Sequence, residues 1–185
     1  YHDSIAIRNI LFDNLGSFSD LSSDAAIYLA EASAGYSFRF TIEDVEIRGP
    51  AGFSSAWAKG TAIRLYASDS AVRRATIENI GGNIVQMSGG VQNNIIENNV
   101  VRNSTCNDND GCIEIYDSNN ITVRYNVFDN VMPLNKDFAV VRVRRFADSA
   151  QGIAQGSNSR VNAVIHNNTF LGALPGLNAN HNAIG

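Results

Sequence analysis

The pattern of hydrophobic and polar positions repeats along the chain in octets that align without gaps. The first and sixth positions of each octet hold β-branched or aromatic residues, such as Ile7 and Phe12, which favour strands facing a core. The eighth position holds Asn or Gly, which best tolerate a left-handed backbone, so a turn is expected there. The spacing varies while the octet stays constant, which indicates a solenoid with insertions between units. The octets are residues 7–14, 42–49, 72–79, 96–103, 123–130 and 165–172.

Three further octet positions predict how the units stack. The fourth position changes from apolar residues to Asn99, Asn126 and Asn168, which predicts a hydrogen-bonded amide ladder inside a bend. In parallel stacking, equivalent side chains lie about 4.8 Å apart, where opposite charges attract. Charge signs alternate at the second and seventh positions, which predicts two solvent-facing ion-pair ladders that control register. The second position holds Arg8, Glu43, Arg73, Glu97, Arg124 and His166. The seventh position holds Asp13, Arg48, Glu78, Arg102, Asp129 and Leu171.

A second type of strand, with alternating apolar and polar residues, lies between octets. With about 25 residues and two or three short strands per coil, these features predict an all-β parallel β-helix of about six coils. We expect it to span residues 1–172, with 173–185 as a C-terminal tail or linker. The second strands are expected at residues 26–31, 62–67, 84–89, 112–117 and 140–145.

Composition narrows the classes of protein. The net charge is −4 with 14 basic residues spread along the chain, so we expect no nucleic-acid partner. No apolar run is long enough for a membrane helix. The first residue is Tyr1, so the chain is expected to be processed or part of something longer. Cys106 and Cys112 flank an Asn/Asp/Gly turn, and both a small disulfide and two unpaired thiols remain open.

One segment carries a family resemblance. It spans residues 111–130 and reads Gly-Cys-Ile-Glu-Ile-Tyr-Asp-Ser-Asn-Asn-Ile-Thr-Val-Arg-Tyr-Asn-Val-Phe-Asp-Asn. This segment resembles the repeat of the pectate-lyase-like superfamily. Residues 91–103 and 160–172 resemble the same repeat. The resemblance implies a right-handed, single-stranded β-helix. It also implies binding or cleavage of acidic polysaccharides, although this superfamily holds lyases, hydrolases, epimerases, tailspikes and adhesins on one scaffold.

Two closer comparisons bear on mechanism. Residues 114–118 resemble the strand that carries calcium ligands and then a lysine base in the chondroitinase B and alginate lyase group. That lysine position is Asp117 here, so the carry-over of a lysine base fails. Residues 107–111 instead resemble the Asp-Asp-Gly calcium motif of another pectate lyase group, and also the acidic motifs of polygalacturonases.

The candidate site is the outward face of the second strands, because most predicted insertions border it. Our leading hypothesis is β-elimination on a uronate polysaccharide. The expected Ca²⁺ ligands are Asp108, Asp110 and Glu114. The expected catalytic residues are Lys136, Arg142 and Tyr116, with Arg142, Arg144 or Lys136 also able to bind the carboxylate. The other substrate-binding candidates are Arg64, Tyr66 and Gln86.

The same residues also fit other functions. Without a metal, the same three carboxylates would supply the pair that a glycosidase needs. Each residue also has a purely structural interpretation, in which residues 142–145 are a solvated run and Asp110 with Gly111 is only a turn. A non-catalytic solenoid is the second class: an adhesin, a tailspike segment or a filament subunit that associates end to end. An exported location is expected in either case, whether secreted, periplasmic or at the cell surface.

Overall fold

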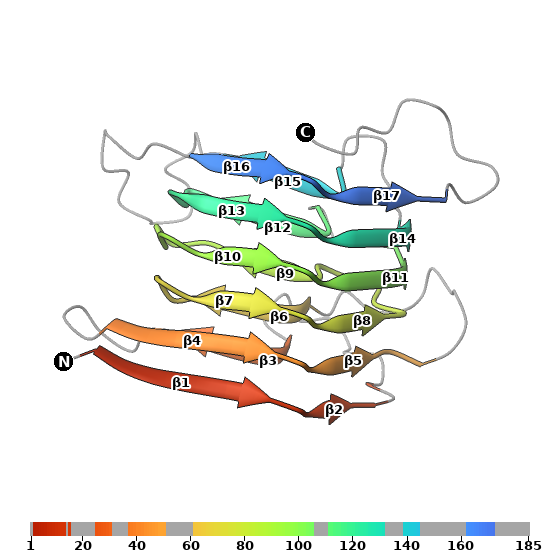
Figure 1. Cartoon of the computed structure of the whole chain (residues 1–185), viewed down its shortest axis with the longest axis horizontal. Helices are drawn as coiled ribbons and strands as arrows, with labels where there is room; N and C mark the ends of the chain where they lie inside the picture. The colour runs from red at the N-terminus through yellow and green to blue at the C-terminus, as the bar shows by residue number, and fades with distance from the viewer. Residues whose placement is uncertain are drawn as a thin grey trace, which may run out of the picture.

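The computed structural model is a stack of coils that builds three parallel β-sheets (Figure 1). It describes residues 2–13, 15, 25–30, 37–50, 61–105, 111–131, 139–144 and 162–172. Two sheets have six strands and one has five, and every strand pair is parallel. The fold is an all-β, right-handed parallel β-helix, as the sequence predicts.

Each sheet takes one strand from successive coils. Sheet A contains β1 (His2–Arg8), β4 (Ser37–Glu43), β7 (Ala71–Arg73), β10 (Ile95–Glu97), β13 (Ile121–Arg124) and β16 (Ala163–His166). Sheet B contains β2 (Leu11–Phe12), β5 (Glu46–Arg48), β8 (Thr76–Glu78), β11 (Val100–Ser104), β14 (Val127–Val131) and β17 (Thr169–Leu171). Sheet C contains β3 (Ala25–Ala30), β6 (Thr61–Tyr66), β9 (Val85–Met87), β12 (Ile113–Tyr116) and β15 (Val141–Arg144).

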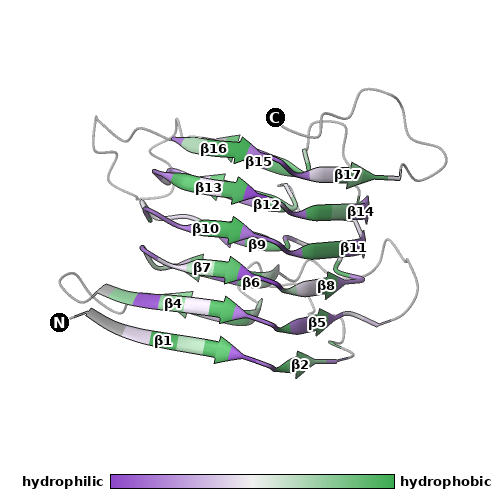
Figure 2. Cartoon of the chain, viewed as in Figure 1, coloured by the Kyte–Doolittle hydropathy of each residue, from purple (hydrophilic) through white to green (hydrophobic). Residues whose placement is uncertain are grey.

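The octet is the corner that joins sheet A to sheet B. Its first position faces the core, and Ile42, Val72 and Val123 are completely buried there. Its sixth position does the same in sheet B, where the Phe128 and Phe170 rings stack with centroids 5.1 Å apart. Figure 2 shows the resulting pattern of apolar strands and polar bends. The predicted core columns are therefore confirmed.

The turn predicted at the eighth octet position is confirmed for Asn79, Asn103, Asn130 and Gly172, which all have positive φ. Gly49 is an exception, because it is not among the glycines with positive φ. A Cβ atom on Gly49 would lie 2.1 Å from the backbone oxygen of Asn79 in the next coil. Gly49 is therefore required by the close approach of two coils rather than by its backbone conformation.

The corner also contains a left-handed turn that the sequence analysis did not predict. All six residues at the third octet position have φ between 52° and 57°, directly between the strands of sheets A and B. Asn and Asp tolerate this conformation, whereas it strains bulkier residues such as Tyr125. The six residues are Asn9, Asp44, Arg74, Asn98, Tyr125 and Asn167.

The predicted amide ladder is confirmed at the fourth octet position. The Asn126 side chain accepts from the backbone N–H of Asn99 at 3.0 Å and from its Nδ2 at 2.9 Å. It donates to Asn168 Oδ1 at 2.9 Å and to the Ile96 carbonyl at 3.0 Å. Asn126 is 1% exposed, so the ladder satisfies polar groups that the bend would otherwise bury unpaired.

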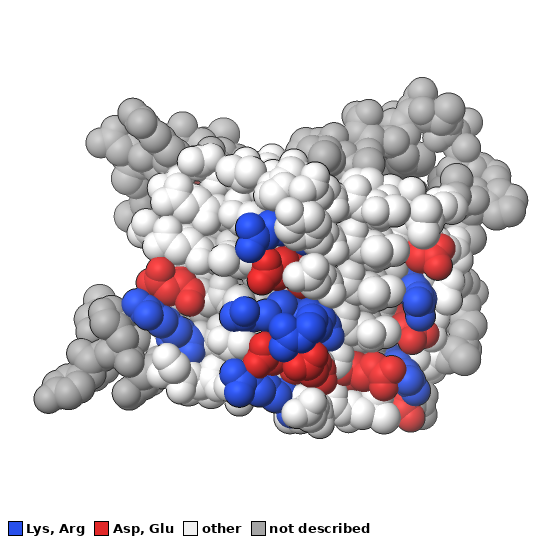
Figure 3. Space-filling view, in the orientation of Figure 1, with Lys and Arg blue, Asp and Glu red and all other residues white. Residues whose placement is uncertain are grey.

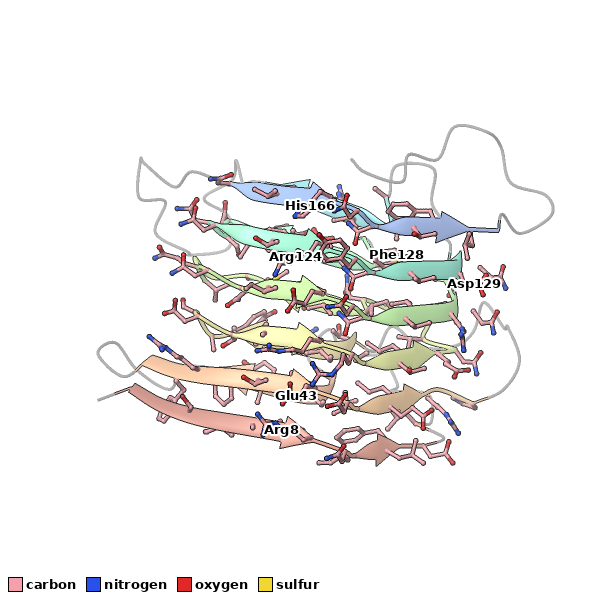
Figure 4. All side chains as sticks on the ribbon, in the orientation of Figure 1. Arg8, Glu43, Arg124, Phe128, Asp129 and His166 are labelled. Carbon is pink, nitrogen blue, oxygen red and sulfur yellow. The ribbon has the colours of Figure 1, made fainter. Side chains whose placement is uncertain are left out.

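The ion-pair ladder at the second octet position is confirmed in part. Its residues stack from β1 to β16 (Figure 4), and Glu43 pairs with both Arg8 and Arg73. Arg124 pairs with Glu97 at 2.7 Å. These charges gather on the face formed by the A–B corner (Figure 3).

The ladder at the seventh octet position is confirmed in part: its register is right, and Glu46, then Glu78 and Asp13, raise the pKa of Arg48. Arg48, Glu78 and Arg102 are aligned across the strands, but no ion pair joins neighbours of this column within the described ranges. Arg48 instead pairs with Glu46, two residues back on its own strand, at 2.5 Å. An acid on the same face of the same strand competes successfully with the acid of the next coil.

Sheet C lies within one or two residues of the five predicted second strands. Cys112, just before β12, is completely buried and disulfide-bonded. The only other cysteine in the chain, Cys106, lies outside the described residues, as does the predicted tail at 173–185. The described ranges contain no helix that is long and apolar enough to cross a membrane.

Candidate functional site

The outward face of sheet C carries a row of polar side chains that crosses all five strands. Strand register aligns Tyr28 with Arg64, Arg64 with Gln86, Gln86 with Glu114, and Glu114 with Arg142. The inward neighbours along each strand are apolar and belong to the core. Because side chains alternate between the two faces of a strand, this row points away from the core.

A second row lies two residues farther along the strands. It contains Tyr66 and, in register with each other, Tyr116 and Arg144. The predicted substrate and catalytic residues of sheet C therefore belong to two adjacent rows on one face. The side chain of Arg144 is outside what the structure describes.

The polar groups of this face are more buried than an outward position implies. Arg64 is 7% exposed, Tyr116 is 5% exposed and Glu114 is completely buried. Tyr28, at one end of the row, is 56% exposed. Charged groups removed from water interact more strongly than those on an open surface, so the charges of this face interact more strongly than exposed ones such as Arg8.

Glu114 is held by the backbone just before its own strand. The N–H of Gly111 donates to Glu114 Oε2 at 2.6 Å, and Asn83 Nδ2 donates to the Gly111 carbonyl at 2.7 Å. A Cβ atom on Gly111 would lie 2.7 Å from Cβ of Arg142. Only glycine fits there, so the segment that orients Glu114 also passes directly beside Arg142.

The aromatic residues form the other end of the site. The Tyr28 and Tyr66 rings meet edge to face with centroids 5.7 Å apart, as expected for diagonal neighbours on adjacent strands. The Tyr66 hydroxyl donates to Gln86 Oε1 at 3.1 Å. This hydrogen bond fixes the orientation of the Gln86 amide, with its NH₂ group directed away from Tyr66.

Two of the three predicted Ca²⁺ ligands fall outside the described part of the chain. Asp108 and Asp110 lie outside the described residues, as does Lys136. In the described ranges, no cluster of three His, Cys, Asp or Glu side chains is arranged to hold a metal ion. Glu114 Oε2 already accepts from the Gly111 N–H, so Oε1 is the oxygen atom with more capacity for a metal ion.

A separate charged cluster lies on the A–B corner and is structural. Arg74 donates to Asp44 at 2.7 and 2.9 Å and to Glu43 Oε2 at 2.7 Å. The hydrogen bond from Arg74 lowers the pKa of Asp44, and the two acids raise the pKa of Arg74. Both shifts favour the charged forms, so this cluster offers no group ready to exchange a proton.

Two residues have a larger role in the site than their sequence positions indicate. Tyr28 is not among the candidate site residues predicted from the sequence, although its diagonal position to Tyr66 is a usable signal. Gly111 was regarded as part of a turn, whereas it contacts both Glu114 and the Arg142 position. No pattern in the sequence indicates that second role.

Comparison with known proteins supports the fold assignment. Residues 4–183 match the family model described as right handed beta helix region. No curated protein and no solved structure matches the chain. Since the match spans nearly the whole sequence, the chain belongs to the right-handed β-helix family.

Proposed function

We propose that this protein acts on an acidic polysaccharide at the outward face of sheet C, as a lyase. The single observation behind the proposal is the register-aligned row that brings Arg64, Glu114 and Arg142 onto one face. The resemblance of residues 111–130 to the pectate-lyase-like superfamily favours a uronate substrate. Aromatic rings beside the row suit sugar faces, and arginine forks suit carboxylates.

The chemistry of β-elimination assigns a role to each group. Arg142 binds the uronate carboxylate, which stabilises the negative charge that develops when the adjacent C–H bond breaks. Tyr116 or Lys136 takes that proton. The C–O bond to the leaving sugar then breaks, and a protonated side chain of the site donates a proton to the leaving oxygen. Glu114, buried beside the Arg142 position, keeps the guanidinium in place. Ca²⁺ held by Asp108, Asp110 and Glu114 would assist Arg142 by binding the carboxylate.

The test is to incubate the chain with alginate, pectate and chondroitin, each with and without Ca²⁺, and to follow both unsaturated products and new reducing ends. We expect unsaturated ends from at least one substrate. We expect Arg142→Gln to lower the rate by about 100-fold or more, as for loss of a group that acts in the transition state.

Arg102→Gln is the matched control, because Arg102 is an exposed arginine on sheet B and the substitution changes the net charge equally. Its rate should equal that of the unmodified chain. Reducing ends without unsaturation would replace the lyase with a glycosidase. The absence of any product on all three polymers would overturn the lyase and favour a non-catalytic solenoid.

A non-catalytic solenoid is the second candidate, and the ends of the stack favour it. Of the eight large hydrophobic side chains exposed in the described residues, six lie on sheets A and B, or on the corner between them, in the first and last coils. Unpaired parallel edges accept further strands, and head-to-tail contacts that do not close produce filaments. The six residues are Ile5, Ile10, Leu11, Val164, Phe170 and Leu171.

Sedimentation of two blocked variants tests this alternative. Leu11→Lys blocks the first coil and Leu171→Lys blocks the last, so neither variant should polymerise alone. If contacts are head-to-tail, a mixture of the two should form a one-to-one dimer through the two unblocked ends. A chain that remains monomeric at every concentration would eliminate the filament alternative.

A further inference from the structure

Arg64 is a buried arginine that has no ion pair with any acid in the described residues. Its neighbours on β6, Ile63 and Leu65, are completely buried in the core, so Arg64 points to the outward face of sheet C. Even so, it is only 7% exposed. Its Nε atom is buried without a hydrogen-bond partner, and the described part of the chain provides no carboxylate within ion-pair distance of its guanidinium.

Such an arrangement is unfavourable unless a ligand completes it. A buried cation without a counter-charge loses its hydration and gains nothing in return, which is why buried charges are nearly always paired. Arg74 and Arg124, by contrast, each have a carboxylate oxygen 2.7 Å from a guanidinium nitrogen. Strain of this kind persists at ligand sites, where binding relieves it.

The surroundings of Arg64 identify the class of ligand. Its two register neighbours are Tyr28 and Gln86. Tyr28 presents a ring that is 56% exposed and braced edge to face by Tyr66. The Gln86 Oε1 atom accepts from the Tyr66 hydroxyl, so its NH₂ group is the donor offered to a ligand. An aromatic face, an amide donor and an unpaired guanidinium together suit a sugar unit that carries an anionic group.

We propose that Arg64, Tyr28 and Gln86 form a binding subsite for one anionic sugar unit, with its carboxylate or sulfate group on Arg64 and its ring against Tyr28. The proposal rests on the proposed function in assuming a polysaccharide ligand. It concerns a different part of the face, because β6 lies two strands from β12 in sheet C, or about 10 Å from Glu114 at the usual strand spacing. Arg64 therefore determines affinity and charge specificity, and Arg142 determines the rate.

Calorimetric binding of three oligosaccharides to the full chain tests the subsite. The ligands are a galacturonate oligomer, its neutral methyl ester and a sulfated chondroitin oligomer. We expect the unmodified chain to bind at least one anionic oligomer more tightly than the ester. Arg64→Gln should weaken that binding about tenfold or more and leave the ester unchanged, since a charge-assisted pair is lost. Arg64→Lys should restore it only partly, because lysine lacks the planar fork.

Arg102→Gln is again the control for net charge, and it should bind as the unmodified chain does. A stability measurement without ligand separates a binding role from a structural one. Removing an unpaired buried cation should leave the denaturation midpoint of Arg64→Gln unchanged or higher, whereas a clear drop would make Arg64 a structural residue and overturn the proposal.

The two proposals fail differently. Charge-dependent binding without cleavage would retain the Arg64 subsite and remove the lyase. Cleavage of a uronan with an unchanged KM in Arg64→Gln would retain the lyase and remove the subsite. Equal affinity for the galacturonate oligomer and its methyl ester, with no preference for the sulfated oligomer, would also overturn the Arg64 subsite.

Discussion

At the scale of single residues, the corner between sheets A and B depends on one left-handed position per coil. Six residues adopt it with nearly the same φ. Asn98 suits this conformation, because its short polar side chain tolerates it better than longer ones do. Arg74 and Tyr125 adopt it at an energetic cost, and both form side-chain contacts that offset the strain: Arg74 with Asp44 and Glu43, and Tyr125 with His166.

Asn98 provides the cleanest test of this corner, because it is exposed and its side chain forms no hydrogen bond or ion pair within the described residues. We expect Asn98→Ala to lower the free energy of unfolding by about 1 kcal/mol, since alanine resists the left-handed region. Asn98→Gly should change stability far less or raise it, because glycine adopts this region freely. Urea denaturation measures both. Equal midpoints for the two variants would show that the left-handed position carries no strain.

At the scale of elements, the bend is stabilised by the asparagine ladder rather than by the strands alone. The strands beside it are short: β10 has three residues and β13 has four. Asn126 forms hydrogen bonds to the coil on either side, and it also holds the Ile96 carbonyl. One side chain therefore connects three successive coils.

Replacing Asn126 should consequently cost much more than replacing an exposed asparagine. Asn126→Ala leaves the Asn99 N–H buried without its acceptor and removes the side-chain bond to the Ile96 carbonyl, and we expect a loss of about 3 kcal/mol in the free energy of unfolding. Asn162→Ala is the control, because Asn162 is exposed and donates only a long bond of 3.4 Å to Asn120 Oδ1. The control should lose no more than about 0.5 kcal/mol. Similar losses in both variants would contradict the ladder's role.

The elements were predictable to the extent that their determinants are local and repeated. Ile42 and Val123 follow a column of like residues, so their burial could be inferred from the octets alone. The left-handed third position was missed because Arg74 and Tyr125 interrupt its run of Asn and Asp. In the seventh-position ladder, Arg48 forms its close ion pair with Glu46 on the same strand rather than with the next coil, and alignment between octets does not weigh such neighbours.

At the scale of the whole molecule, the candidate site could be located but not described from the sequence. Alternation along the second strands placed Arg64, Glu114 and Arg142 on one face, and the parallel register confirms that they share a row. The burial of Glu114 and Arg64 was not predictable, because it depends on packing over the outward face rather than on the repeat. The lyase and Ca²⁺ assignments stay predictions.

The stacked architecture itself predicts where the molecule is least stable. Each coil contacts only the coils before and after it, so the first and last coils have one neighbour where the others have two. The end coils also expose apolar side chains such as Ile10 and Phe170, whereas Ile96 and Val101 in the middle are 1% exposed. We therefore expect amide hydrogen exchange to be slowest in β10 and β11, and about 100-fold faster in β1, β2, β16 and β17. In Asn126→Ala, protection should fall first in β13 and β16, because the substitution removes the ladder bonds of the coil that contains β13. Protection should remain high in β7 and β8. Uniform protection across all coils would contradict this expectation, because it would require the stack to open in a single cooperative step.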